Sequence, residues 1–212
     1  MEPTVLSLDM PDETARPKRS ICAITPVFNR RDLTLDCLRT LFESDLGGLD
    51  LHCIVVDDGS SDGSAAAIAD AFPQVEIITG DGTLWYSEGT NVGIRSALLR
   101  DPDYMLLYNN DSRFPRDALQ KLVSCAERHP SSLVGGVLID WDQPERIFQV
   151  GTQWQTGYGG WRTWERQTVA SLPDRPFAGE TIVGNCMLVP TQAMRDCGLM
   201  KAEAMPNFGD AE

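Results

Sequence analysis

The sequence predicts an α/β fold in which a mostly parallel central sheet is flanked by helices, in a Rossmann-like arrangement. Two observations lead to this prediction. Short, nearly continuous apolar segments alternate with amphipathic segments from residue 21 to about residue 139. Clusters of polar residues and glycines follow the apolar segments, where the carboxyl ends of parallel strands would lie.

The apolar segments predict five strands, and the amphipathic segments predict the helices between them. In the first helix, Leu35, Leu38 and Leu41 recur at helical spacing. Pro115 suits the first turn of a later helix, and Gly198 suits the end of the last one. The expected strands cover residues 21–24, 51–56, 75–78, 104–108 and 133–139, and the expected helices cover residues 31–43, 65–72, 90–100, 115–126 and 190–197.

The composition is that of one soluble globular domain. The chain has 212 residues, of which 42% are hydrophobic and 23% charged. A net charge of −13 excludes a surface that binds nucleic acid by neutralising many phosphates. The six cysteines form no C-x-x-C pair, so we expect reduced structural thiols in a cytoplasmic protein. No apolar run reaches the roughly 18 residues of a membrane-spanning helix, and residues 1–20 read as a loose polar tail rather than a signal peptide.

Two acidic clusters follow expected strands. Asp57 and Asp58 can accept hydrogen bonds from a base N–H and from ribose hydroxyls, or they can cap the next helix. Asp111 follows the expected fourth strand, where a pyrophosphate would lie. A single carboxylate there can help to hold Mg²⁺ or Mn²⁺, and a plain strand-to-helix turn is the alternative.

The segment of residues 82–93 combines glycines with two aromatic residues before an expected helix. Gly82 would allow close approach of a phosphate or sugar to the backbone, and Trp85 could contact it. The spacing does not match G-x-G-x-x-G, which argues against a dinucleotide site. Burial of the aromatic rings in the core is the alternative.

The pattern changes after residue 139, where tryptophans alternate with glycine and threonine. We expect short strands and loops that form a lid on the same core, with Trp154 and Trp161 stacking on a sugar or packing in a small β region. Asp210 and Glu212 follow a Pro-containing loop near the end of the sequence. A carboxylate there can take the proton of an attacking hydroxyl group, and two solvated acids are the alternative.

Taken in order, these motifs resemble the inverting glycosyltransferases of family 2, which have the GT-A fold. The resemblance rests on five segments in the family's order and runs from residue 25 to residue 212. The aromatic run of residues 84–86 is similar to branches that build bacterial surface polysaccharides, including rhamnosyltransferase-like enzymes. The matching segments are Thr25-Pro26-Val27-Phe28-Asn29-Arg30, Val56-Asp57-Asp58-Gly59-Ser60, Gly89-Thr90-Asn91-Val92-Gly93-Ile94, Tyr108-Asn109-Asn110-Asp111 and Phe208-Gly209-Asp210-Ala211-Glu212.

The resemblance implies a role for each matching position. Asp210 would be the general base, and Asp111 would bind a divalent metal, Mn²⁺ or Mg²⁺, at the donor diphosphate. Trp154, Trp161, Asn185 and Glu212 are the candidate acceptor contacts. The candidate nucleotide and donor contacts are Thr25, Pro26, Val27, Phe28, Asn29, Asp57, Asp58, Gly82, Trp85, Asn91, Asn110 and Asp111.

The resemblance also implies an activity and an organisation. Residues 21–140 would bind a nucleotide-diphosphate sugar, and residues 141–212 would form the acceptor and lid half of the same domain. The sugar would pass with inversion to a saccharide or lipid-linked saccharide, at a cytoplasmic site that allows peripheral contact with the membrane. Relatives continue beyond the base motif, so we expect the second half to be incomplete.

Two departures from the family pattern and two other functions stay open. Asn109 and Asn110 precede Asp111 where many relatives carry a second acid, and Gly209 stands where relatives often have Glu. A non-catalytic carbohydrate- or nucleotide-sugar-binding protein of the same fold is one alternative. A sugar nucleotidyltransferase is the other, although its usual Gly-rich basic loop is missing after the first expected strand.

Overall fold

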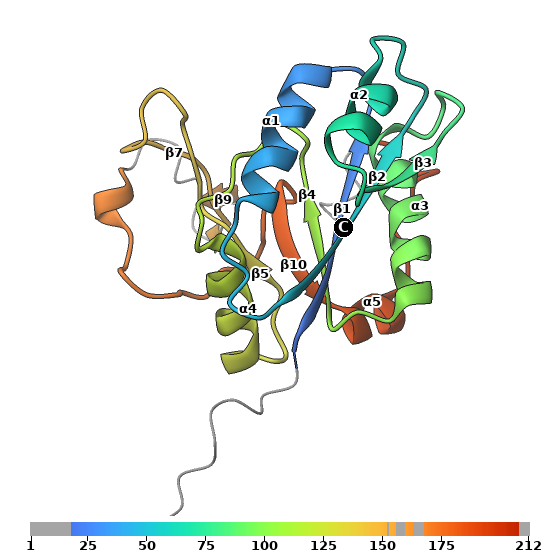
Figure 1. Ribbon diagram of the computed structural model, residues 1–212. Coiled ribbons are helices and arrows are strands. Elements are labelled where there is room, and N and C mark those ends of the chain that lie inside the picture. Colours follow the sequence, from blue (N-terminus) through green and yellow to red (C-terminus); the bar gives the residue numbers. More distant parts are fainter. Residues whose placement is uncertain (1–17, 152, 156–159, 163–167, 208–212) are drawn as a thin grey trace, which may run out of the picture.

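The computed structural model describes residues 18–151, 153–155, 160–162 and 168–207, with residues 153–155 and 160–162 described by their backbone alone (Figure 1). The strands are β1 (Ser20–Val27), β2 (Asp50–Asp57), β3 (Glu76–Thr79), β4 (Tyr104–Tyr108), β5 (Val134–Gly135), β6 (Leu138–Ile139), β7 (Ile147–Gln149), β8 (Gln153–Gln155), β9 (Gly160–Arg162) and β10 (Cys186–Pro190). The helices are α1 (Arg31–Phe42), α2 (Ser64–Ala71), α3 (Trp85–Arg100), α4 (Ala118–Arg128), the short 3₁₀ helix η2 (Val169–Ser171) and α5 (Thr191–Cys197).

A six-stranded sheet in the order β3-β2-β1-β4-β10-β5 forms the centre of the molecule. The first four strands of this order are parallel, and β10 runs antiparallel to both of its neighbours. Side chains of β1 alternate between two apolar clusters, because successive residues of a strand point to opposite faces. Ile21 and Ala23 pack with α1, α2 and α4, whereas Cys22 and Ile24 pack with α3 and α5. The predicted α/β fold with a mostly parallel, helix-flanked sheet is confirmed.

The expected fifth strand over residues 133–139 was wrong. The segment divides into β5 and β6, which belong to different sheets. Gly135 and Gly136 lie at the division, where a Cβ atom would come within 2.5 Å of Ile182 Cγ2 and 3.1 Å of Cys186 Sγ, respectively. Apolar character marks the segment as buried, but it does not show that β10 takes the place beside β4.

Two helices begin at other residues than expected. Helix α3 begins at Trp85, five residues before the expected start. Helix α4 begins at Ala118 rather than at Pro115, because the Pro115 carbonyl accepts the Ala118 N–H in a separate turn. The other expected elements have the predicted type with ends that differ by a few residues.

Residues on both sides of position 140 contribute to the central sheet, since β10 lies between β4 and β5. Helix α5 follows β10 and packs on the face that α3 also covers. The small pairs β6–β7 and β8–β9 stand outside the main sheet. Across the part of the chain that the structure describes, no helix combines the length and the apolar character needed to cross a bilayer.

Candidate functional site

The carboxyl ends of β2, β1 and β4 form one edge of the sheet. The chain continues from β1 to β2 on one side, whereas β4 pairs with the other side of β1. The strand order therefore reverses between β1 and β4, and open α/β sheets bind ligands at such a point. Asp58 follows β2 and Asp111 follows β4, so the two acids lie on the same edge on opposite sides of β1.

The loop after β1 is held in an uncommon conformation. Asn29 and Arg30 both have left-handed φ angles, of 60° and 61°, which few non-glycine residues adopt. The Asn29 side-chain oxygen accepts the Ser61 N–H at 3.0 Å, and the Asn29 N–H donates to Ser60 Oγ at 2.7 Å. These bonds tie the ends of β1 and β2 together. The loop leaves Phe28 60% exposed at the edge of the sheet.

Arg30 crosses the reversal point to pair with Asp111. Its Nη1 lies 3.2 Å from Asp111 Oδ2, and the two side chains are 62% and 40% exposed. An exposed pair of this kind contributes only about 0–1 kcal/mol, so an anion at Arg30 or a cation at Asp111 can replace it. The Asn110 amide instead donates to Thr34 Oγ1 in α1 at 2.8 Å. Sequence reasoning did not assign Arg30 to the site, although its place beside Asn29 in the matching segment was a usable signal.

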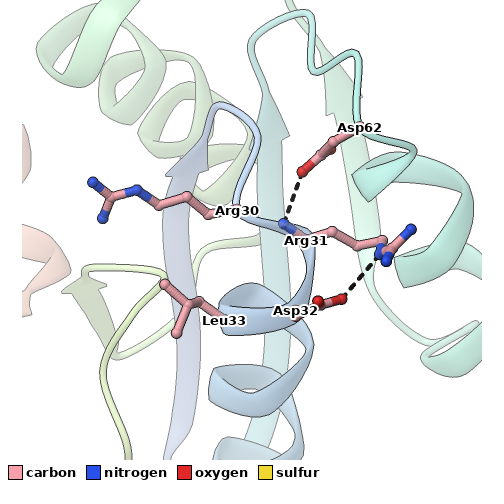
Figure 2. A pocket seen from close by; sticks show the side chains of 5 residues that line it. All are labelled: Arg30, Arg31, Asp32, Leu33 and Asp62. Atoms are coloured by element: carbon pink, nitrogen blue, oxygen red, sulfur yellow. Dashed lines mark hydrogen bonds and ion pairs between the residues drawn. The ribbon is translucent and has the colours of Figure 1, made fainter.

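A depression of about 360 Å³ lies beside the start of α1, next to this edge (Figure 2). It is lined by Arg30, Arg31, Asp32, Leu33 and Asp62. The Arg31 N–H donates to Asp62 Oδ2 at 2.9 Å, and the Arg31 side chain pairs with Asp32 at 3.0 Å. Figure 2 shows the Arg30 side chain extending to the opposite side from that of Arg31. Arg31 is thus paired within the depression, whereas Arg30 pairs with Asp111 outside it. The candidate site is therefore the strand edge that Arg30 and Asp111 share.

Asp57 and Asp58 are buried and accept hydrogen bonds from backbone amides. Asp57 Oδ1 accepts the Ser60 N–H at 2.9 Å. Asp58 accepts three N–H groups: Gly82 at 2.8 Å, Leu84 at 2.9 Å and Trp85 at 3.0 Å. Asp58 therefore caps α3, which lies farther along the chain than the adjacent helix α2. Any nucleotide contact of Asp58 has to share oxygens that already satisfy the start of α3.

Trp85 begins α3 with a left-handed φ of 57°, and the residue is 61% exposed. An exposed tryptophan gains little from burial, and a left-handed conformation costs a non-glycine residue roughly 1–2 kcal/mol. The Asp58 carboxylate offsets this cost by accepting the N–H of Trp85. The ring is thus presented at the edge instead of lying in the core, which was the alternative considered for it.

The expectation that residues 82–89 precede the helix was wrong for Gly89, because α3 begins at Trp85. Gly89 and Gly93 lie within α3. A Cβ atom would come within 2.9 Å of Pro26 Cβ at Gly89 and within 2.3 Å of Ile24 Cγ2 at Gly93. These glycines let α3 pack closely on β1. Gly82 precedes the helix, and its N–H is one of the three that Asp58 accepts.

Asn91 and Ser87 bond to a segment that lies more than 100 positions later in the sequence. Asn91 is 2% exposed, and its amide bonds to both the N–H and the carbonyl of Met200. Ser87, also buried, contacts Met205 and Pro206. A donor contact would require Asn91 to give up these bonds. Sequence reasoning missed Ser87, although two small polar residues at i and i+4 of a helix were a usable signal.

The remaining candidates divide into three groups. The side chains of Thr25 and Val27 are buried in the sheet, so a nucleotide can reach only their backbone, and Pro26 packs against Gly89. The Asn185 carbonyl accepts the Asn109 N–H at 3.2 Å, which places Asn185 beside the end of β4. Trp154 pairs with Trp161 through the backbone of β8 and β9, while their side chains, together with all of Asp210 and Glu212, lie outside the described residues.

The residues present fit a divalent cation that is shared with a ligand, rather than one held by protein alone. Within the described ranges, no three His, Cys, Asp or Glu side chains gather as a potential metal site. Asp111 is one partly exposed carboxylate whose partner Arg30 is also exposed. Mg²⁺ and Mn²⁺ often take only one or two protein carboxylates, with phosphate and water oxygens as the other ligands.

Comparisons with known proteins give both a family and a fold. The family described as Glycosyl transferase family 2 matches residues 22–187. The mannosyltransferase PcManGT of Pyrobaculum calidifontis, solved with GDP-Man and Mn²⁺, superimposes with a TM-score of 0.61 at 15% identity, over 88% of this chain and 49% of that chain. S. aureus TarS 1-349, solved with UDP, superimposes with a TM-score of 0.61 at 15% identity, over 90% of this chain and 52% of that chain.

This chain therefore spans about half the length of these two solved proteins. No curated protein sequence matches it. At 15% identity the structural likeness concerns the fold, which is of the GT-A type. The family match covers most of the chain and includes the strands that carry Asp58 and Asp111. The chain thus belongs to glycosyl transferase family 2.

Proposed function

We propose that this protein transfers a sugar from a nucleotide-diphosphate donor to a hydroxyl group of a saccharide or lipid-linked saccharide, with inversion at the anomeric carbon. The observation that supports this most directly is the strand edge on which Asp58 and Asp111 flank β1. A donor at the reversal point between β1 and β4 would lie between these acids. We place the reaction at the cytoplasmic side of the cell, where peripheral contact with the membrane would bring a lipid-linked acceptor within reach.

The exposed groups of the edge suit the parts of such a donor. The Phe28 ring offers a stacking surface for the base, and the Trp85 ring offers one for the sugar. The guanidinium group of Arg30 can bind a diphosphate in place of Asp111. Related folds accept such ligands, since PcManGT was solved with GDP-Man and TarS with UDP.

Asp111 would hold Mn²⁺ or Mg²⁺ together with the diphosphate. When bound, such an ion neutralises the negative charge that grows on the nucleoside diphosphate as it leaves. Release of Arg30 from Asp111 would accompany donor binding, because both partners of the ion pair gain a ligand of opposite charge. Metal affinity should therefore be weak without nucleotide and stronger with it.

Asp210 would act as the general base. Its carboxylate removes the proton of the acceptor hydroxyl while the acceptor oxygen bonds to the anomeric carbon and the bond from that carbon to the diphosphate oxygen breaks. Attack from the face opposite the diphosphate inverts the anomeric configuration. Trp154, Trp161, Asn185 and Glu212 remain the proposed acceptor contacts.

A thermal-shift screen with nucleoside diphosphates and nucleotide sugars, each with and without Mn²⁺, tests donor and metal binding. A ligand at about 100 times its Kd stabilises the folded state by about 2.7 kcal/mol, which gives a measurable rise in Tm. Asp111→Asn should retain the rise produced by nucleotide and lose the additional rise produced by Mn²⁺. Asp117→Asn, which removes an exposed carboxylate paired with Lys121, is the matched control and should keep both. An equal additional rise in Tm with Mn²⁺ in the two variants would show that Asp111 does not bind the metal.

Release of nucleoside diphosphate distinguishes a transferase from a protein that only binds nucleotide sugars. The wild-type protein should hydrolyse its donor slowly and transfer the sugar faster when an acceptor is present. Asp210→Asn should abolish transfer and leave donor Kd within about twofold, since the base contacts the acceptor rather than the donor. Loss of donor binding with unchanged turnover would refute the role of Asp210.

A further inference from the structure

Helix α3 holds the chain segment that leads toward Asp210. The Asn91 amide clamps one residue of that segment, because its Nδ2 donates to the Met200 carbonyl at 2.8 Å and its Oδ1 accepts the Met200 N–H at 3.0 Å. One turn earlier on the helix, Ser87 Oγ donates to the Met205 carbonyl at 2.5 Å and the Ser87 N–H donates to the Pro206 carbonyl at 2.8 Å. Four hydrogen bonds thus fix residues 200–206 along two turns of α3.

We call Asn91 and Ser87, with their bonds to residues 200–206, the clamp. Neither side chain favours formation of the helix itself. Asparagine and serine are weaker helix formers than alanine or leucine, and a buried polar group costs free energy unless it is hydrogen-bonded. Asn91 and Ser87 are both buried in the first half of α3. Both side chains bond to the backbone of residues 200–206, and Asn91 Nδ2 also donates to Glu88 Oε2 at 3.1 Å. Backbone groups are present whatever side chains that segment carries. These hydrogen bonds therefore fix the position of the segment and do not depend on its side chains.

The same end of α3 also holds Asp58. The carboxylate of Asp58 accepts the N–H groups of Leu84 and Trp85, and the Pro206 carbonyl accepts that of Ser87. The first N–H groups of a helix have no partner within that helix. In α3, some of these groups bond to Asp58 and another bonds to the segment before Asp210. Asp210 lies four positions after Pro206 in the sequence, so the held segment ends shortly before it along the chain.

We propose that Asn91 and Ser87 are positioning residues, which fix the general base relative to the donor by holding residues 200–206 against the start of α3. The inference rests on the proposed function, and it assigns Asn91 a role other than direct contact with the donor. A base displaced by about 1 Å loses on the order of 100-fold in rate. The proposed donor contacts Asp58 and Trp85 bond to each other and not to residues 200–206. The clamp should therefore affect kcat and spare donor affinity.

The test uses Ser87→Ala and Asn91→Asp, with Ser96→Ala as the matched control. Ser96 lies on the same helix, but its hydroxyl donates to Glu76 instead of the clamped segment. We expect both clamp variants to lower kcat for transfer by 10- to 100-fold with donor KM and Kd within about twofold. Amide hydrogen exchange of residues 200–206 should quicken in both. Ser87→Thr keeps a hydroxyl group and should restore most of the rate, whereas Ser96→Ala should change neither readout.

Two results would overturn the inference. A large loss of donor affinity in Asn91→Asp would make Asn91 a donor contact, and unchanged exchange at residues 200–206 in Ser87→Ala would show that the clamp holds nothing. Ser87→Ala keeps the backbone bond and removes only a hydroxyl group, so it answers the question even where Asn91→Asp fails to fold. A wild-type protein without transferase activity would refute the proposed function instead. The exchange measurement would still decide whether the clamp exists.

Discussion

At the scale of single residues, the site is built from side chains that carry out two tasks at once. Asp58 lies at the predicted donor edge and also accepts three backbone N–H groups at and just before the start of α3. Arg30 forms part of a strained loop and also pairs with Asp111. Trp85 pays a conformational cost to place an aromatic ring in solvent. Strain and exposure together at one residue support the proposed role of Trp85 in donor binding.

Trp85→Gly should therefore raise stability while it weakens donor binding. Glycine adopts the left-handed φ of 57° without steric cost, so we expect the free energy of unfolding to rise by about 0.5–1 kcal/mol. Loss of a stacking ring should weaken donor binding by about 0.5–1.5 kcal/mol, or roughly two- to tenfold. Urea unfolding and calorimetric titration with nucleotide sugars measure the two effects.

Trp85→Ala separates the effect of losing the ring from the effect of relieving the backbone strain. Alanine removes the ring but keeps the left-handed strain, so its donor affinity should match that of Trp85→Gly while its stability shows no gain. A glycine variant less stable than the alanine variant would contradict the assignment of strain at this position.

At the scale of helices and strands, local patterns predicted the elements and long-range contacts decided their limits. The first strands and helices were predictable because each buries a periodic apolar face. The start of α3 was not, since it depends on Asp58, which lies 27 positions before Trp85. The same difference between local patterns and long-range contacts decided which parts of the candidate site could be predicted. Asp58 and Asp111 could be placed at one edge because parallel strands align their ends, whereas the partner of Asn91 lies 109 positions away.

The packing of α3 on β1 gives a prediction at this scale. In Gly93→Ala the added methyl group would lie 2.3 Å from Ile24 Cγ2, so the helix must move away from the sheet. Overpacking costs about 1–3 kcal/mol, which exceeds the gain of up to about 1 kcal/mol in helix propensity. We expect a net loss of stability in urea unfolding. Leu99→Ala, at an exposed position of the same helix, is the control and should change stability by less than about 0.5 kcal/mol. A stabilised Gly93→Ala would show that α3 and β1 are not in close contact.

At the scale of the whole molecule, the carboxylate of Glu76 joins β3 and β2 to α3. Glu76 on β3 accepts hydrogen bonds from Ser96 at 2.6 Å and from Arg100 at 2.8 Å, and it lies 3.0 Å from His52 Nε2 on β2. Partial burial raises the pKa of Glu76, but the hydrogen bonds from Ser96, His52 and Arg100 outweigh it and bring this pKa to about 2. The outermost strand β3 is thus joined to β2 and α3 by an ionised carboxylate.

This network predicts how stability depends on pH. The pKa of Glu76 is lower in the folded state than its ordinary value of 4.5, so its contribution is present above about pH 4.5 and is lost as the pH falls toward 2. The contribution is on the order of 2–3 kcal/mol. In Glu76→Gln, urea unfolding at pH 6 should show a loss of this size, and at pH 2 the difference from wild type should nearly vanish. Asp70→Asn, at an exposed position of α2, is the control, and a pH-independent difference for Glu76→Gln would contradict the account.

The insertion of β10 into the sheet has a consequence for synthesis of the chain on the ribosome. Leu188 pairs beside Leu106 although 82 positions separate them. At about 5–20 residues per second, the apolar edge of β4 waits on the order of 4–16 s for its partner to be made. An unpaired apolar edge invites pairing with other chains. The nascent protein is therefore most exposed to aggregation in this interval, and a chaperone that covers β4 should raise its yield.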